Sequence, residues 1–301
     1  MRIVIAGSSG FIGSRLVADL AADGHDVVRL VRREPSASGE VSWAPERGVL
    51  SPEALAGSDA VVNLAGVGVG DKRWTEAYKR LIRSSRVDTT ATLARTIATV
   101  SAAGEGPAVL VNASAIGYYG DRGDEELDEC SAPGTGFFTD VCRDWEAATM
   151  PAEEAGVRVC RIRSGLVVGP RGGLMGRLIP LFKAGLGGRL GNGRQYMPWV
   201  SLADEIGAIR FLLDHPEVHG PVNVTGPAPV TNAEFTRALA AAVHRPALFT
   251  VPGFALRTVL GEFALDVTTS SRVLPKTLVA AGYRHRHADV NSSLRWAISH
   301  R

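Results

Sequence analysis

Short apolar runs alternate with longer amphipathic stretches along the first half of the chain. Each run is rich in Val, Ile, Leu or Ala, and the runs are residues 3–6, 26–31, 59–66, 108–114 and 157–162. Strands buried on both faces of a parallel sheet have such continuous apolar sequences. Three stretches typical of helices lie between the runs, at residues 14–22, 74–100 and 137–154. This alternation predicts an α/β fold with a doubly wound parallel sheet.

A glycine-rich turn joins the first apolar run to the first helical stretch, with the sequence Gly-Ser-Ser-Gly-Phe-Ile-Gly over residues 7–13. A strand, a turn of this kind and a helix start are typical of dinucleotide-binding, Rossmann-type domains. Gly7 permits the tight turn, Gly10 lets the backbone approach a pyrophosphate, and Gly13 lets the helix pack closely on its strand. The pyrophosphate would bind at the helix N-terminus.

The pattern changes after residue 165. Gly- and Pro-rich linkers at 169–173 and 185–193 alternate there with short helices and a late strand predicted at 222–224. We therefore predict a nucleotide-binding Rossmann domain over residues 1–165, to which later residues can add strands. A smaller, mostly helical, interleaved region over residues 166–301 would cover the cofactor cleft and bind the substrate.

Two arginines at the end of the second predicted strand indicate which dinucleotide binds. NAD is usually held there by an Asp or Glu that accepts hydrogen bonds from the ribose hydroxyls. This chain has Arg32 and Arg33, which cannot accept these bonds but can donate to a 2′-phosphate. The sequence thus favours NADP(H) over NAD(H), although Glu34 beside the arginines leaves NAD open.

Composition and charge narrow the class of protein. The chain has 301 residues, of which 45% are hydrophobic, and a formal net charge of +2. These values suit a globular core and give no electrostatic argument for binding nucleic acid. No run approaches the roughly 18 apolar residues of a membrane helix, and the first run is too short for a signal peptide. We expect a cytoplasmic protein without membrane or nucleic-acid partners.

The three cysteines, Cys130, Cys142 and Cys160, are odd in number and lack the spacing of metal ligands. We predict reduced thiols that act as small apolar residues, with no disulfide and no metal site. The seven histidines also lack metal-ligand spacing.

Three loop motifs resemble those of one enzyme superfamily. They are the glycine-rich turn, Asn-Leu-Ala-Gly at 63–66, and Ala-Ser-Ala-Ile-Gly-Tyr-Tyr-Gly at 113–120. With them the chain resembles the extended short-chain dehydrogenase/reductases, and more narrowly the epimerase-family proteins. The narrower resemblance rests on Lys72–Thr75, Ser85–Val87, Val141–Glu146, Met197–Ser201, Leu260–Glu262 and Arg272–Pro275. It implies an NADP(H)-binding domain, a C-terminal helical module and a substrate that is not established.

The motifs and the resemblance together predict the residues that contact the cofactor. The predicted cofactor-binding residues are Gly7, Ser9, Gly10, Phe11, Ile12, Gly13, Arg32, Arg33, Leu64, Ala65, Gly66, Arg86, Ala113 and Ser114.

The chain departs from the superfamily at the catalytic pair. Relatives use a Tyr-x-x-x-Lys pair, in which the Lys stabilises the tyrosine phenolate so that it can exchange a proton with substrate. The matching positions hold Phe138 and Cys142, which supply neither an exchangeable phenol nor a positive charge. The usual acceptor hydroxyl aligns with Ala115, one residue after Ser114. On the long helix, the Asn common in relatives is replaced by Arg86.

Two hypotheses follow from this altered site. In the first, the chain is an oxidoreductase or epimerase-like enzyme. The phenol of Tyr119, or of Tyr118 beside it, exchanges the proton, Arg86 lowers the phenol pKa, and Ser114 donates to the substrate oxygen. The predicted substrate contacts are Arg73, Trp74, Tyr118 and Trp199, with Lys183 or Arg194 available to an anionic substrate.

In the second hypothesis the chain binds NADP(H) without turnover and reports the cofactor state to a partner, because the Tyr and Lys are missing. Packing is an alternative role for Trp74 and Trp199. Relatives often pair through two long helices, which here would be residues 74–100 and 137–154, so we also predict a homodimer.

Overall fold

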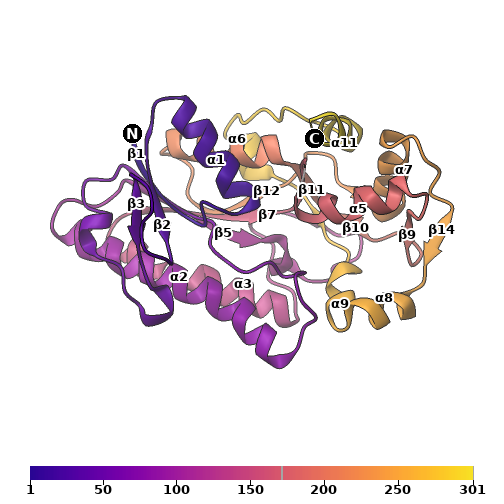
Figure 1. The fold of residues 1–301 in the computed structure, drawn as a ribbon, viewed down its shortest axis with the longest axis horizontal. Coiled ribbons are helices and arrows are strands. Elements are labelled where there is room, and N and C mark those ends of the chain that lie inside the picture. The colour runs from indigo at the N-terminus through magenta and orange to yellow at the C-terminus, as the bar shows by residue number, and fades with distance from the viewer. Residues whose placement is uncertain (171, 301) are drawn as a thin grey trace. The chain divides into compact units, whose positions relative to one another are not determined.

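The structure is a computed structural model that describes residues 1–170 and 172–300 (Figure 1). The chain forms two compact units, each built from separate segments. Unit 1 comprises residues 1–114, 141–162 and 209–221, and unit 2 comprises residues 115–140, 163–208 and 222 onward. The segment 115–140 thus belongs to unit 2 and the segment 209–221 to unit 1.

A seven-stranded sheet of order β12-β7-β5-β4-β1-β2-β3 is the main feature of the fold. The strands are β1 (Arg2–Ala6), β2 (Asp26–Val31), β3 (Glu40–Ser42), β4 (Ala60–Asn63), β5 (Val109–Ala115), β7 (Arg158–Ser164) and β12 (Gly220–Val224). β1 pairs in parallel with β2 and with β4, and β4 pairs in parallel with β5. The predicted Rossmann-type α/β fold is confirmed.

Helices follow the strands of this sheet in alternation. They are α1 (Phe11–Ala22), α2 (Glu76–Ala102), α3 (Phe137–Ala147), α4 (Met150–Glu154) and α6 (Leu202–Asp214), with short 3-10 turns at Pro45–Arg47, Pro52–Ala54 and Ile116–Tyr119. The sequence analysis predicts one helix over 137–154, but the structure has two. Pro151 has no N–H to continue the hydrogen-bond ladder, so a new helix begins there.

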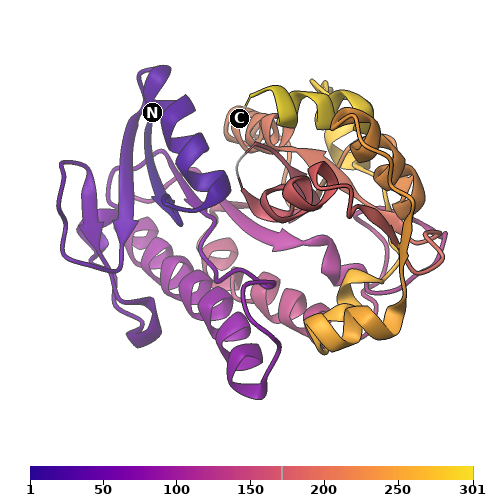
Figure 2. The same ribbon diagram turned by 45° about the vertical axis from the view of Figure 1, so that its right-hand side comes forward.

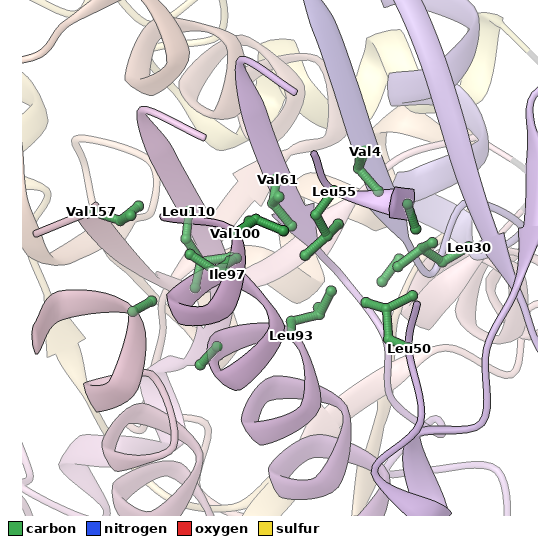
Figure 3. Packing of buried hydrophobic residues seen from close by; sticks show 14 of the residues in the cluster. Val4, Leu30, Leu50, Leu55, Val61, Leu93, Ile97, Val100, Leu110 and Val157 are labelled. Carbon is green, nitrogen blue, oxygen red and sulfur yellow. The ribbon is translucent and has the colours of Figure 1, made fainter. Parts of the chain in front are cut away.

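Strand alternation divides the core of unit 1 between the two faces of the sheet. Val4, Leu30 and Val61 pack with Leu93 and Ile97 of α2 in one buried cluster (Figure 3). Alternate residues of β1, Ile3 and Ile5, are also fully buried and point to the opposite face. Helix α1 lies on that side, whereas α2 runs along the other (Figures 1 and 2). Because both faces are covered, the central strands β1 and β4 are apolar over residues 3–6 and 60–62.

Among the described residues, unit 2 contains four pairs of short strands and a hydrophobic cluster of its own. The pairs are β6 (Glu126–Leu127) with β15 (Arg272–Val273), β8 (Leu166–Val168) with β11 (Trp199–Ser201), β9 (Gly188–Leu190) with β14 (Phe249–Val251), and β10 (Tyr196–Met197) with β13 (Val230–Thr231). Its helices are α5 (Gly173–Lys183), α7 (Asn232–Ala242), α8 (Gly253–Leu260), α9 (Phe263–Val267), α10 (Lys276–Ala280) and α11 (Val290–Ser299). In the described part of the chain, no helix combines the length and apolarity needed to cross a membrane.

A buried carboxyl in unit 2 is only partly hydrogen-bonded. Glu205 is fully buried, and its Oε1 accepts a hydrogen bond from Ser164 Oγ at 2.6 Å. Its Oε2 has no hydrogen-bond partner among the described residues. Burial penalises the ionised form and raises the pKa of Glu205 to about 7.

We predict that Glu205 makes the free energy of unfolding fall as pH rises from about 4.5 to about 7. In this range the folded carboxyl keeps a proton that the unfolded chain has lost, so raising the pH favours unfolding. Glu205→Gln should therefore stabilise the protein above pH 7 by on the order of 3 kcal/mol, with little effect at pH 4.5. Denaturant unfolding at both pH values measures this difference. Glu217→Gln, at an exposed position, is the matched control; equal responses of the two variants to pH would contradict the prediction.

Candidate functional site

The glycine-rich turn lies directly against the loop that follows β4. Gly7 has a φ of +80°, and a Cβ placed on it would lie 2.6 Å from the carbonyl carbon and oxygen of Leu64 and 2.8 Å from the nitrogen of Ala65. A Cβ on Gly13 would lie 2.2 Å from the Gly7 carbonyl oxygen. Both positions therefore require glycine for reasons internal to the protein.

Gly10 is different, because the protein itself leaves room for a side chain there. Its φ is −72°, which an L-residue adopts without strain. A Cβ at Gly10 would contact only the Gly7 carbonyl oxygen, at 3.3 Å, among the described residues. Gly10 is exposed at the start of α1, so the missing side chain leaves an open cradle above the turn. Such a cradle fits the close approach of a dinucleotide pyrophosphate.

The N-terminus of α1 suits an anion. The helix has no side-chain N-cap and no acidic residue in its first turn. Its first N–H groups and the positive end of its dipole therefore have no negative side chain on the helix to compensate them. The predicted contacts Ser9, Phe11 and Ile12 lie in this turn and at the helix start. The residues present fit the phosphates of a dinucleotide.

We predict opposite outcomes for alanine at the second and third glycines. Gly10→Ala should leave the melting temperature nearly unchanged but weaken NADPH binding at least about tenfold, because its methyl group occupies the pyrophosphate position. Gly13→Ala should lower the melting temperature, because its methyl group overlaps the backbone of Gly7. Thermal unfolding and NADPH fluorescence titration measure the two effects. Unweakened NADPH binding by Gly10→Ala would contradict this role of the cradle.

A buried polar cluster positions the loop after β4. The Thr90 hydroxyl of α2 accepts hydrogen bonds from Asn63 Nδ2 at 2.9 Å and from Trp145 Nε1 at 3.0 Å, and donates to Asn112 Oδ1 at 3.1 Å. Asn63 also accepts, through Oδ1, a hydrogen bond from the Ala65 backbone N–H at 3.2 Å. The cluster therefore joins α2 and α3 to the ends of β4 and β5.

Side chains of α2 hold the next part of the same loop. Arg86 Nη2 donates to the Val67 carbonyl oxygen at 3.0 Å, and Tyr78 Oη donates to the Gly68 carbonyl oxygen at 2.6 Å. Trp74, at the end of the loop, donates from Nε1 to the Val69 carbonyl oxygen at 2.8 Å. These contacts give Trp74, a predicted substrate residue, a role in the shape of the loop.

The two arginines after β2 have different surroundings. Arg33 donates from Nη1 and Nη2 to the two carboxylate oxygens of Glu40, both at 2.8 Å. The carboxylate also lies 3.3 Å from Arg29 Nη2 and accepts a hydrogen bond from the Ser36 N–H. The hydrogen bonds from Arg33 lower the pKa of Glu40 to about 2. Arg32 is exposed and forms no hydrogen bond or ion pair with any described residue.

Ser114 is paired with an acidic residue of α3. Its hydroxyl donates to Glu146 Oε1 at 2.6 Å, and both side chains are buried. Strand alternation puts Ser114 on the same face of β5 as Asn112, with Ala113 and Ala115 on the other. The serine that we predicted as a donor to substrate therefore directs its proton to Glu146.

Tyr119, the predicted catalytic phenol, lies in the interior of unit 2. It has no exposed surface, donates to Asn223 Oδ1 at 2.7 Å and accepts a hydrogen bond from Arg163 Nη1 at 3.0 Å. Burial raises its pKa to about 12, although Arg163 acts in the opposite direction. A proton-exchanging phenol needs a lowered pKa, so this environment opposes the role that we assigned to Tyr119. The cation beside its hydroxyl is Arg163, a residue that the sequence analysis did not single out.

Tyr118 differs from its neighbour in both surroundings and access. It is half-buried, and its hydroxyl forms no hydrogen bond with any described residue. The guanidinium carbon of Arg163 lies 3.5 Å from the centroid of its ring. Arg163 itself is buried. Tyr118 thus combines an available hydroxyl with an adjacent cation.

The positions of the missing catalytic pair are filled by packing. Phe138 is buried, and a Cβ on Gly117 would lie 2.3 Å from its ring, so the ring occupies the space above that glycine. Cys142 is fully buried. Neither residue replaces the chemistry of a Tyr-Lys pair.

Trp199 requires a correction. It is 1% exposed, belongs to the core of unit 2, and donates from Nε1 to the Ala228 carbonyl oxygen at 3.1 Å. Its ring also faces Gly226, whose absent Cβ makes room for it. We therefore assign it the packing role rather than the predicted substrate contact. Arg73, Lys183 and Arg194 are all exposed.

Comparison with known proteins gives the family. Residues 3–225 match the NAD dependent epimerase/dehydratase family, and residues 251–297 match a C-terminal domain of unknown function, DUF1731. The chain belongs to the NAD dependent epimerase/dehydratase family. The resemblance inferred from its motifs is confirmed, including the C-terminal module.

Members of this family align with nearly the whole chain. Epimerase family protein Mb2239 of Mycobacterium bovis is 48% identical over 298 residues, which are 99% of this chain and 97% of the relative. The crystal structure of human epimerase family protein SDR39U1 (isoform 2) with NADPH has a TM-score of 0.90, with 32% identity and 99% of both chains covered.

A second similar structure is that of a nucleoside-diphosphate sugar epimerase from Corynebacterium glutamicum. Its TM-score is 0.81, with 33% identity over 99% of this chain and 58% of that one.

Several important residues carried no recognisable signal in the sequence. Glu40 lies outside any motif, and Arg163 is one of many arginines. Asn63 belongs to the Asn-Leu-Ala-Gly motif and Thr90 to a predicted helix, but the sequence does not show that they form a hydrogen-bonded cluster. The residues of that cluster come from four separate elements, which only folding brings together. Within the described residues, no group of three or more His, Cys, Asp and Glu side chains is arranged to hold a metal ion.

Proposed function

We propose that the chain binds NADP(H) in preference to NAD(H), with Arg32 as the residue that recognises the 2′-phosphate. The observation that carries this proposal is the pairing of Arg33 with Glu40, which leaves Arg32 as the exposed guanidinium at the end of β2 without a partner among the described residues. The human relative solved with NADPH supports the same choice.

The hydrogen bonds and burial of the Glu40 carboxylate support the preference for NADP(H) over NAD(H). An acidic residue near this strand end could accept hydrogen bonds from the ribose hydroxyls of NAD. The carboxylate of Glu40 already accepts hydrogen bonds from Arg33 and from Ser36 and lies beside Arg29. Its side chain is only 3% exposed. It is therefore not available to a ribose, and its negative charge is compensated by Arg33 and Arg29, which reduces its repulsion of a 2′-phosphate.

We predict that Arg32→Ala reduces the preference for NADPH over NADH roughly 10- to 100-fold, the effect of losing charged hydrogen bonds to the phosphate. Arg33→Ala removes the same charge one residue away and should weaken both cofactors by similar factors, because it loosens the loop at Glu40. Titration of each variant with NADPH and NADH measures the ratio of dissociation constants. The reverse result, in which only Arg33→Ala changes the ratio, would overturn the assignment.

For the reaction, we propose an oxidoreductase or epimerase-like enzyme in which Tyr118 replaces the missing tyrosine. NADP(H) would supply or accept a hydride at nicotinamide C4. In the reducing direction a substrate carbonyl carbon gains the hydride, and its oxygen gains a proton from Tyr118 Oη. Arg163, stacked on the Tyr118 ring, would stabilise the negative charge left on the phenol oxygen. Solvent then returns the proton.

The position after β5 suits either tyrosine, and hydrogen bonding selects Tyr118 over Tyr119. Tyr118 follows β5 by only three residues, at the carboxyl end of the strand, where ligands bind in sheets of this kind. Its hydroxyl is also uncommitted, whereas that of Tyr119 is hydrogen-bonded to Asn223 and Arg163. In this proposal Ser114 does not exchange the proton, and its hydrogen bond to Glu146 links β5 to α3.

We predict that Tyr118→Phe lowers NADPH-dependent turnover by about 100-fold, within the usual range for general acid catalysis, and leaves the NADPH dissociation constant unchanged. Tyr119→Phe is the matched control, and its main effect should be lower thermal stability, because Asn223 and Arg163 lose a buried partner. NADPH oxidation is followed with a panel of carbonyl compounds that includes nucleoside-diphosphate sugars, since a similar structure carries that name. Full turnover by Tyr118→Phe would exclude its role.

A second candidate function is a non-catalytic NADP(H) sensor. It is favoured by the packed positions of Phe138 and Cys142, where a proton-exchanging pair would lie in an active relative. Tight NADPH binding without oxidation across the whole panel would support the sensor. The cytoplasmic location and the homodimer stay predictions.

A further inference from the structure

Arg86 introduces a buried cation directly behind the loop that follows β4. Its side chain is 8% exposed, and the guanidinium donates to the carbonyl oxygens of Ile82 and Val67, each at 3.0 Å. A Cβ on Gly66 would lie 3.3 Å from the guanidinium carbon and 3.4 Å from Nη1. The guanidinium therefore lies directly against Gly66, an exposed residue of this loop.

The side chain remains charged at neutral pH. Burial lowers the pKa of Arg86 to about 10, which is still far above 7. Its hydrogen bonds to carbonyl oxygens and its position 5.1 Å from the Trp145 ring centroid stabilise a cation in this place.

The loop in front of Arg86 begins in contact with the glycine-rich turn, so we infer which part of the cofactor it faces from the topology of the sheet. The glycine-rich turn, which fits the pyrophosphate, is in contact with Leu64 and Ala65 at the start of this loop. A dinucleotide in a doubly wound sheet crosses from the first strand and helix to the second half of the sheet at the point where the strand order reverses. Here the order reverses between β1 and β4. The loop after β4 is therefore on the path to the nicotinamide.

The two redox states of the cofactor differ in charge at that end. The oxidised nicotinamide ring carries a positive charge, whereas the reduced ring is neutral. A buried cation repels the first and has little effect on the second, and the repulsion is stronger in a protein interior than in water.

We propose that Arg86 makes this site select reduced NADPH over oxidised NADP⁺. This inference rests on the proposed binding of NADP(H) and assigns Arg86 an electrostatic role toward the cofactor, in addition to its contacts with the loop. Under this proposal the protein would remain loaded with NADPH even where both forms are present, which suits a reductase and equally a sensor of the reduced cofactor.

The test compares the dissociation constants of NADPH and NADP⁺ by isothermal titration calorimetry, with the full chain. The wild type should bind NADPH at least about tenfold more tightly than NADP⁺. Arg86→Gln, which keeps hydrogen-bond donors but removes the charge, should bring the ratio close to one. Arg86→Lys, which keeps the charge and loses the planar fork, should retain most of the ratio. A wild-type ratio near one, or an unchanged ratio in Arg86→Gln, would overturn the proposal.

A control separates the charge of Arg86 from its contacts with the loop. Tyr78→Phe removes the hydrogen bond to the Gly68 carbonyl oxygen in the same loop and leaves the charge intact. It should weaken both cofactors by similar factors without changing the ratio. If Arg86→Gln does not fold, Arg86→Lys decides instead, because loss of the ratio in this variant would show that loop shape rather than charge controls it. Failure of the wild type to bind either form would contradict the proposed function itself.

Discussion

Gly7 brings the backbone of the glycine-rich turn so close to Leu64 and Ala65 that no side chain fits between them. This contact exists because β1 and β4 are parallel neighbours in the sheet. Their carboxyl ends therefore lie at the same edge, and the loops that follow them are adjacent. It aligns the N-terminus of α1 with the loop after β4 and sets the path for a dinucleotide between them. The open cradle at Gly10 and the buried cation behind Gly66 both take their significance from this arrangement.

The buried polar cluster around Thr90 holds the loop after β4 in its position beside the glycine-rich turn. Hydrogen bonds among buried polar groups are strong in a low dielectric but costly when one partner is lost. Asn63, Thr90, Asn112 and Trp145 come from β4, α2, β5 and α3, so the cluster fixes four elements relative to one another. Through Asn63 Oδ1 it also fixes the Ala65 N–H, and hence the loop that faces Gly7. The loop geometry thus depends on side chains that do not themselves line the site.

Pairing between side chains decides which polar groups remain available for chemistry. Glu40 binds Arg33, Glu146 accepts the proton of Ser114, and Arg163 and Asn223 occupy the hydroxyl of Tyr119. Arg33, Ser114 and Tyr119 are candidates for binding or chemistry in the sequence, but each forms its hydrogen bonds within the protein. Arg32 and the Tyr118 hydroxyl have no such partner among the described residues. This difference separates the two side chains that remain available for binding or chemistry from those that hydrogen bonds within the protein already occupy.

The sequence alone determined the sheet, the nucleotide-binding turn and the family. Apolar strands, helical periodicity and the spacing of Gly7, Gly10 and Gly13 are local properties, and each can be recognised in a short window of residues. It also located both arginines after β2 and the absence of a Tyr-Lys pair. It could not distinguish Arg32 from Arg33 or Tyr118 from Tyr119, because adjacent residues of one type differ only in their partners. Those partners, Glu40, Arg163 and Asn223, are brought to them by folding from positions 7 to 104 residues away. Burial and hydrogen bonding are properties of the tertiary structure, so only the folded chain decides which of two like side chains can act.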